Sequence, residues 1–156
     1  MGLGAVAMFD KLKRLFQGDP PPRAEKIDDP ILGTLRWSEE DEGWISSATY
    51  RGVGFEFQIS GTPEPDKALL AHAADIARNK EDFIARVMRR VKSDAATIRR
   101  FAAYRDEIEK LKIDRVCLFW PERPGDGMIS FSGGRDCRLW RCDYIAREPK
   151  GLGFDS

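Results

Sequence analysis

The sequence predicts an α+β fold in which an antiparallel sheet of five or six strands packs against one long and one shorter helix. Two segments, 31–59 and 116–145, alternate apolar with polar residues between turn-forming residues, which is typical of half-buried strands. Between them, residues 66–111 repeat apolar side chains every three, four or seven positions, as amphipathic helices do. The predicted order is therefore a three-strand meander, two helices and a three-strand C-terminal meander.

The first meander is predicted from its short connections. Strands are expected at residues 31–37, 44–50 and 55–59, joined by the acidic turn SEEDEG (38–43) and by RGVG (51–54). Connections of this length join only antiparallel neighbours, because a parallel pair needs a crossover of a dozen or more residues.

The helical segment is predicted to begin at Asp66, whose side chain can cap the first turn. One long helix is expected over residues 66–92, with Asn79 as a point at which it could bend or break. Ser93 or Asp94 is expected to cap the second helix, which continues to about residue 111.

The C-terminal meander is predicted to hold the central strand of the sheet. Residues 116–120 carry apolar side chains on both faces, so this strand is expected to be covered on both sides. Strands at 128–132 and 137–145 follow, with a tight turn at Gly133-Gly134, and the tail from 147 to 156 is expected to be irregular.

Residues 1–26 are interpreted as an appendage to a single folded domain at 27–156. Phe9, Leu12, Leu15 and Phe16 recur at helical spacing with basic residues between them, which predicts a short amphipathic helix. The Pro-rich stretch QGDPPP that follows is typical of a stiff linker.

Composition narrows the classes of function. The chain has 156 residues with 26 basic and 26 acidic side chains, and this zero formal charge argues against a dedicated nucleic-acid binder. It has no apolar run of about 18 residues, so no transmembrane segment is expected. Three cysteines give no disulfide framework and indicate reduced thiols in a cytoplasmic protein.

No cofactor or metal is predicted from the residues that could carry chemistry. Cys137 and Cys142 are an odd number of positions apart, so a strand places them on opposite faces, where they cannot bind one ion. The only histidine, His72, has Asp75 at i+3 to orient its ring and could serve as a catalytic base. The simpler interpretation of His72 is a partly exposed helix residue.

Two charged regions are candidate partner-binding surfaces, although the simpler interpretations are a solvated turn and cross-strand ion pairs. Their candidate residues are Glu39, Glu40 and Asp41 in the acidic turn and Arg135, Asp136, Arg141 and Asp143 in the last hairpin. A third group, on one face of the long helix, is the candidate nucleic-acid site and comprises Arg86, Arg89 and Arg90.

The layout resembles small bacterial α+β families of unknown function, some of which are encoded near polymorphic toxins and are suspected immunity proteins. The resemblance is carried by LGTLRW (32–37), Trp44, EIEKL with Ile113 (107–113), and the hairpin GMISFSGG…RLWRCDYI (127–145). It implies no catalytic residues, and it implies that the partner is another protein.

These observations favour a non-enzymatic cytoplasmic protein-interaction domain, in its narrower form an immunity-type inhibitor that acts by surface complementarity. Two alternatives stay open, a small hydrolase-like enzyme with a site near His72 and a nucleic-acid accessory protein that uses the helix arginines. The sequence does not define the oligomeric state.

Overall fold

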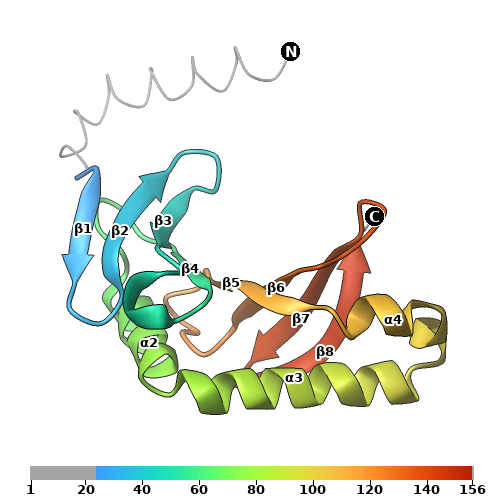
Figure 1. Cartoon of the computed structure of the whole chain (residues 1–156). Coiled ribbons are helices and arrows are strands. Elements are labelled where there is room, and N and C mark those ends of the chain that lie inside the picture. Colours follow the sequence, from blue (N-terminus) through green and yellow to red (C-terminus); the bar gives the residue numbers. More distant parts are fainter. Residues whose placement is uncertain (1–23, 156) are drawn as a thin grey trace.

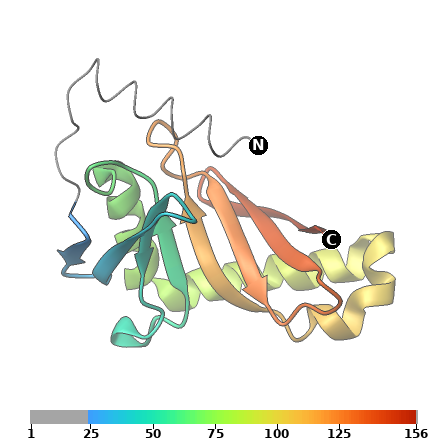
Figure 2. The ribbon, with the colours of Figure 1, turned by 90° about the horizontal axis from the view of Figure 1, so that it is seen from above.

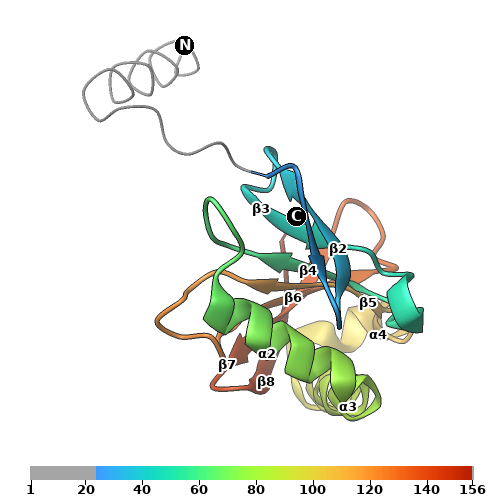
Figure 3. The ribbon, with the colours of Figure 1, turned by 90° about the vertical axis from the view of Figure 1, so that its left-hand side faces the viewer.

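The computed structural model describes residues 24–155, which form one eight-stranded sheet with α2 and α3 along one of its faces (Figures 1 and 3). The strands lie in the sheet in chain order, from β1 to β8. Their bounds are β1 (Lys26–Asp29), β2 (Gly33–Ser38), β3 (Gly43–Ser46), β4 (Glu56–Ile59), β5 (Lys112–Leu118), β6 (Gly127–Ser132), β7 (Leu139–Ile145) and β8 (Glu148–Asp155).

All the helical segments of the described chain except one lie between β4 and β5. The α-helices are α2 (Lys67–Arg78), α3 (Lys80–Thr97) and α4 (Arg105–Ile108). The 3₁₀ segment η2 (Arg99–Tyr104) joins α3 to α4, and η1 (Tyr50–Gly52) lies between β3 and β4. The predicted helix and linker at 1–26 fall almost entirely on residues 1–23, which lie outside the described residues.

The predicted antiparallel sheet of five or six strands is wrong, because the sheet has eight strands and is mixed. The first missed strand is β1, whose sequence KIDD shows no apolar alternation, and the second is β8 within the predicted irregular tail. β8 includes Pro149 and Gly151, yet it pairs with β7 from Leu139↔Asp155 to Ile145↔Glu148. Residues 148–155 form a strand because β7 supplies their hydrogen-bond partners, and not because their own strand propensity is high.

The sheet is mixed because β4 and β5 run parallel, with Phe57 opposite Val116. Every other neighbouring pair in the sheet is antiparallel. α2, α3 and α4 together form the crossover that returns the chain to the starting end of β4, as a parallel pair requires.

The helical segment begins as predicted and then breaks. Asp66 caps α2, its carboxylate accepting the Leu69 N–H at 3.1 Å. The single long helix is wrong, since Asn79 leaves the helical conformation (φ −117°, ψ 37°) and its side chain donates to the Asp75 carbonyl. Asp94 is not a cap either, because it lies inside α3.

The core lies between the sheet and α2–α3. The central strand is confirmed: Val116, Cys117 and Leu118 of β5 are all buried, although Trp120 lies beyond the strand and is 38% exposed. Fully buried aromatic rings extend this core from strand to helix, and they include Trp44, Phe55, Phe57, Phe83 and Tyr144.

The opposite side of the sheet, the helix-free face, is covered by none of the described helices; Figure 2 looks down on it, with α3 behind the strands. Two rows of directly opposed residues cross it. The first row is Arg36, Ile45, Gln58, Cys117, Met128 and Asp143, and the second is Glu56, Arg115, Ser130 and Arg141.

Asp94 joins α3 to the edge strand β8. Its buried carboxylate accepts the Leu152 N–H at 2.9 Å and pairs with Arg90 at 3.3 Å. An edge strand exposes backbone N–H groups that other chains can bind. On β8 the Leu152 N–H is instead bound by Asp94 of the same chain.

We expect Asp94→Ala to lower the free energy of unfolding by about 2–3 kcal/mol, because it leaves a buried N–H without an acceptor. Arg90→Ala removes the half-exposed partner of Asp94 but leaves the hydrogen bond from Leu152, so it should cost less than Asp94→Ala. Urea unfolding of both variants measures the difference, and equal losses would mean that the Leu152 hydrogen bond contributes little.

Candidate functional site

His72 is buried against Tyr144 and does not lie at a surface site. Its side chain is 6% exposed, Nε2 lies 3.0 Å from the Tyr144 hydroxyl, and the two rings stack with centroids 5.7 Å apart. Burial lowers the pKa of His72, the Arg147 charge lowers it further, and Asp75 opposes them. Burial also raises the pKa of Tyr144 to about 12. The pair is therefore a neutral hydrogen bond between α2 and β7.

The predicted partly exposed histidine is thus wrong, and Asp75 does not orient the ring. Asp75 is an exposed residue that pairs with Arg78 at 3.2 Å. A histidine base needs a nucleophile or a reacting group within hydrogen-bond reach. Among residues 24–155, the one side chain that hydrogen-bonds to His72 is Tyr144, whose pKa is raised.

The two buried cysteines lack the lowered pKa that a nucleophilic thiol needs. Cys117 and Cys142 are buried, Cys137 is exposed in the β6–β7 loop, and all three are free thiols. Burial raises the pKa of Cys117 to about 12 and also raises that of Cys142, so neither is a thiolate near neutral pH. Residues 24–155 hold no group of three or more His, Cys, Asp or Glu arranged to bind a metal ion.

A polar cluster on the helix-free face is centred on Arg115 of β5. Its guanidinium contacts Glu56 at 3.0 Å, Asp41 at 3.3 Å and the Gln58 side-chain oxygen at 3.1 Å. Burial alone would lower the pKa of Arg115, but hydrogen bonding and charge from Glu56, with the charge of Asp41, raise it. The Gln58 side chain also donates to the Asp41 carbonyl at 3.1 Å. The acidic turn is therefore in contact with this face of the sheet through Asp41.

A second arginine, Arg141 of β7, lies two strands away in the same row, at a backbone spacing of about 10 Å. It pairs with Asp155 at 3.0 Å and with Asp143 at 3.4 Å. The helix-free face therefore presents two guanidinium groups held by four carboxylates.

Apolar side chains lie beside these charges. Leu139 and Ile145 lie on the same face of β7 as Arg141 and Asp143, one at each end of the strand, and they are 69% and 47% exposed. Met128 and Ile45, both half-buried, lie in the first row of the face. The face is mixed in polarity, unlike the apolar face beneath the helices.

The seven candidate partner-binding residues are only partly brought together. Asp41, Arg141 and Asp143 lie on or over the helix-free face, and Glu39 and Glu40 are exposed in the acidic turn next to Asp41. The sequence reasoning missed Glu56, Arg115, Gln58 and Asp155. Glu56 and Arg115 occupy polar positions of their strands, but they are 59 residues apart, and only the β4–β5 pairing unites them.

Arg135 and Asp136 belong to a separate loop that is fixed to α4. The buried Glu107 carboxylate accepts the Arg135 N–H and pairs with Arg138 at 2.9 Å, while the 82% exposed Asp136 pairs with Arg138 at 3.3 Å. Burial alone would raise the pKa of Glu107, but the hydrogen bonds from Arg135 and Arg138 lower it. These contacts give the loop a structural role, because they hold it against α4.

The candidate nucleic-acid residues do not form a stripe of available cations. Arg86 pairs with Asp82 at 3.1 Å and with Glu148 at 3.4 Å, and Arg90 pairs with Asp94. Arg89 is exposed. Two of the three guanidinium groups therefore already bind carboxylates, which weakens the case for phosphate binding.

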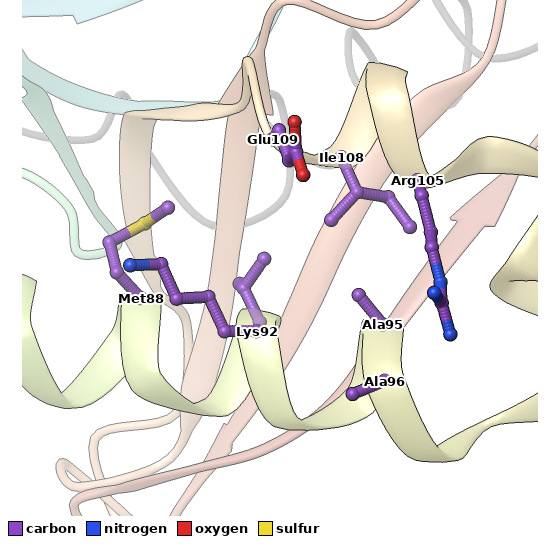
Figure 4. Close-up of a pocket in the computed structure, with 8 residues that line it drawn as sticks. Met88, Lys92, Ala95, Ala96, Arg105, Ile108 and Glu109 are labelled. Atoms are coloured by element: carbon purple, nitrogen blue, oxygen red, sulfur yellow. The ribbon is translucent and has the colours of Figure 1, made fainter.

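An apolar cavity of about 330 Å³ lies between α3 and α4 (Figure 4). Its lining residues are Met88, Val91, Lys92, Ala95, Ala96, Arg105, Ile108 and Glu109. A neighbouring cavity of about 320 Å³ shares Met88 and is also lined by Val53, Gly54, Phe55, Ile84, Leu111, Lys112 and Ile113. A third, of about 360 Å³, lies between the β1–β2 turn and α2.

No family model matches the chain, and no curated protein or solved structure is significantly similar to it. Among the described helices, none has the length and apolar character needed to cross a membrane.

The His72–Tyr144 pair predicts a specific pH dependence. Because the folded pKa of His72 lies below its ordinary 6.5, the unfolded chain takes up the proton first, and stability present above about pH 6.5 is lost as the pH falls. The chain has one histidine, so His72→Phe should flatten this dependence between about pH 7 and pH 5. Urea unfolding across that range tests it, and equal slopes for the two proteins would contradict the buried neutral state.

Glu107 predicts a second, more acidic dependence. Its folded pKa lies below the ordinary 4.5, so its contribution is present above that value and is lost as the pH falls below it. We expect Glu107→Gln to cost about 2 kcal/mol near neutral pH, since a charged hydrogen-bond acceptor is removed from a buried site. The difference from the parent should shrink below about pH 4.5, as measured by urea unfolding. Asp136→Asn, at an exposed position of the same loop, is the control and should change stability little.

Proposed function

We propose that this chain is a non-enzymatic cytoplasmic protein-interaction domain that binds another protein through its helix-free face. The observation that carries the proposal is the row of Arg115, Ser130 and Arg141, with both arginines held in place by carboxylates. Exposed Leu139 and Ile145 border the row.

The physical argument rests on preorganisation. A guanidinium that is already fixed by Glu56 and Asp41, or by Asp155 and Asp143, loses little side-chain freedom when a partner arrives. Alternating positive and negative groups favour one complementary charge pattern and repel others, which gives specificity. Adjacent aliphatic side chains supply the apolar contacts that protein interfaces also use.

The narrower form of the proposal is an immunity-type inhibitor that blocks its partner by surface complementarity. It is supported by the mixed polarity of the helix-free face and by the structural role of His72. A cytoplasmic location is supported by three thiols that form no disulfide.

Substitutions on the helix-free face should abolish recovery of a stoichiometric partner. We expect the full chain, purified under native conditions from its own cells, to retain one protein, and Leu139→Glu and Arg141→Ala to reduce that retention at least about tenfold. Arg89→Glu, on exposed α3 surface, is the matched control and should retain the partner. Unfolding curves for each variant separate lost binding from lost folding.

Two results would contradict the proposal. One is repeated purification without a stoichiometric partner, and the other is a partner whose retention is the same for Leu139→Glu, Arg141→Ala and the parent. Loss with Arg89→Glu alone would move the binding surface to α3.

A further inference from the structure

A groove with an apolar floor runs along α3, where the two cavities that share Met88 meet. Ile84, Met88, Val91 and Ala95 are spaced by four, three and four residues, so they lie on one face of the helix. From Ile84 to Ala95 this floor extends about 16 Å, or three helical turns. α4, β5 and the segment 53–55 supply the opposite wall.

The rim of the groove is mainly positive. Lys92 and Arg105 line the α4 end, Lys112 lines the other end, and Glu109 is the one acid among the lining residues. All four side chains are exposed, and none of the three cations forms an ion pair with another described residue. In Figure 4, Lys92 and Arg105 lie on either side of the cavity and Ile108 lies between α3 and α4.

We propose that this groove binds an acidic amphipathic helix of a partner protein. A helix laid along an apolar groove inserts side chains from one of its faces, at spacings of three, four and seven residues. Ile84 lines one cavity and Val91 the other, and these residues are seven positions or about 10 Å apart along α3. This spacing matches apolar anchors at i and i+7 of a helix parallel to α3. Carboxylates beside those anchors would face Lys92, Arg105 and Lys112.

Charge selects this occupant over the chain's own N-terminal segment. Residues 9–16 combine Phe9, Leu12 and Phe16 with two lysines and an arginine against a single aspartate. A basic helix would bring like charges to Lys92 and Arg105, and like-charge contacts oppose binding. An acidic helix replaces that repulsion with attraction at the same apolar contacts.

This inference does not depend on the helix-free face, because the groove is built from α3, α4 and the other side of β5. The two surfaces are also separable by substitution. Leu139→Glu changes only the helix-free face, whereas changes at Lys92 and Arg105 affect only the groove.

The test uses two designed peptides of about 16 residues, one with leucines at i, i+3 and i+7 flanked by glutamates, and one with every glutamate replaced by lysine. Binding to the full chain is followed by fluorescence anisotropy at low salt, and the site is mapped by amide chemical shifts. We expect the acidic peptide to bind at least about tenfold more tightly, with shifts at Ile84, Met88, Ala95 and Ile108.

Charge reversal then tests the rim. Lys92→Glu combined with Arg105→Glu alters only exposed side chains, and it should weaken the acidic peptide at least about tenfold and favour the lysine peptide. Lys150→Glu, at an exposed position on β8, is the control and should change neither affinity. Met88→Glu, which places a carboxylate in the groove floor, should remove binding of both peptides.

The proposal is overturned if neither peptide binds, if the shifts map to another surface, or if the double reversal leaves the acidic peptide unaffected. Preference of the parent protein for the lysine peptide would also overturn it, and would favour a basic occupant such as residues 9–16. Loss of acidic-peptide binding with Leu139→Glu would place the peptide on the helix-free face instead.

Discussion

The parallel pairing of β4 with β5 is the constraint on which the rest of the structure depends. Each half of the sheet is an antiparallel meander of four strands, and these two strands supply the only hydrogen-bonded junction between them in the described chain. The same register opposes Glu56 to Arg115 and Gln58 to Cys117. The helix-free face therefore exists as a continuous surface only because the helical crossover returns β5 beside β4.

The Arg115 cluster favours that register more than it adds stability. A guanidinium that is 23% exposed loses much of its hydration, and its attraction to Glu56 and Asp41 largely offsets that loss. A shift of one residue would turn Arg115 toward the apolar core and bring Val116 to the helix-free face. Such a shift would leave a charge buried without partners, which is strongly unfavourable.

The sequence predicted local features, such as individual strands and a helix cap. It did not predict which strands pair with one another in the sheet. Alternation identified the central strand around Val116, and residue chemistry identified the cap at Asp66. β8 escaped because Pro149 and Gly151 lower its strand propensity, while β7 and Asp94 supply its hydrogen bonds. For the same reason Arg141 and Asp143 could be proposed from their hairpin, but Arg115 and Glu56 could not, because a distant pairing unites them.

The positions of the charges on α3 explain why a formally neutral chain can still present a positive surface. Arg86 and Arg90 are engaged with Asp82, Glu148 and Asp94, on the side of the helix that faces β8. Lys92, with Arg105 and Lys112, lines the groove, where Glu109 is the single lining carboxylate against these three cations. Ion pairing within the fold thus neutralises two of the three arginines that the sequence pattern emphasised, Arg86 and Arg90, and leaves other cations unpaired. The charge that a partner meets is therefore decided by tertiary contacts and not by composition.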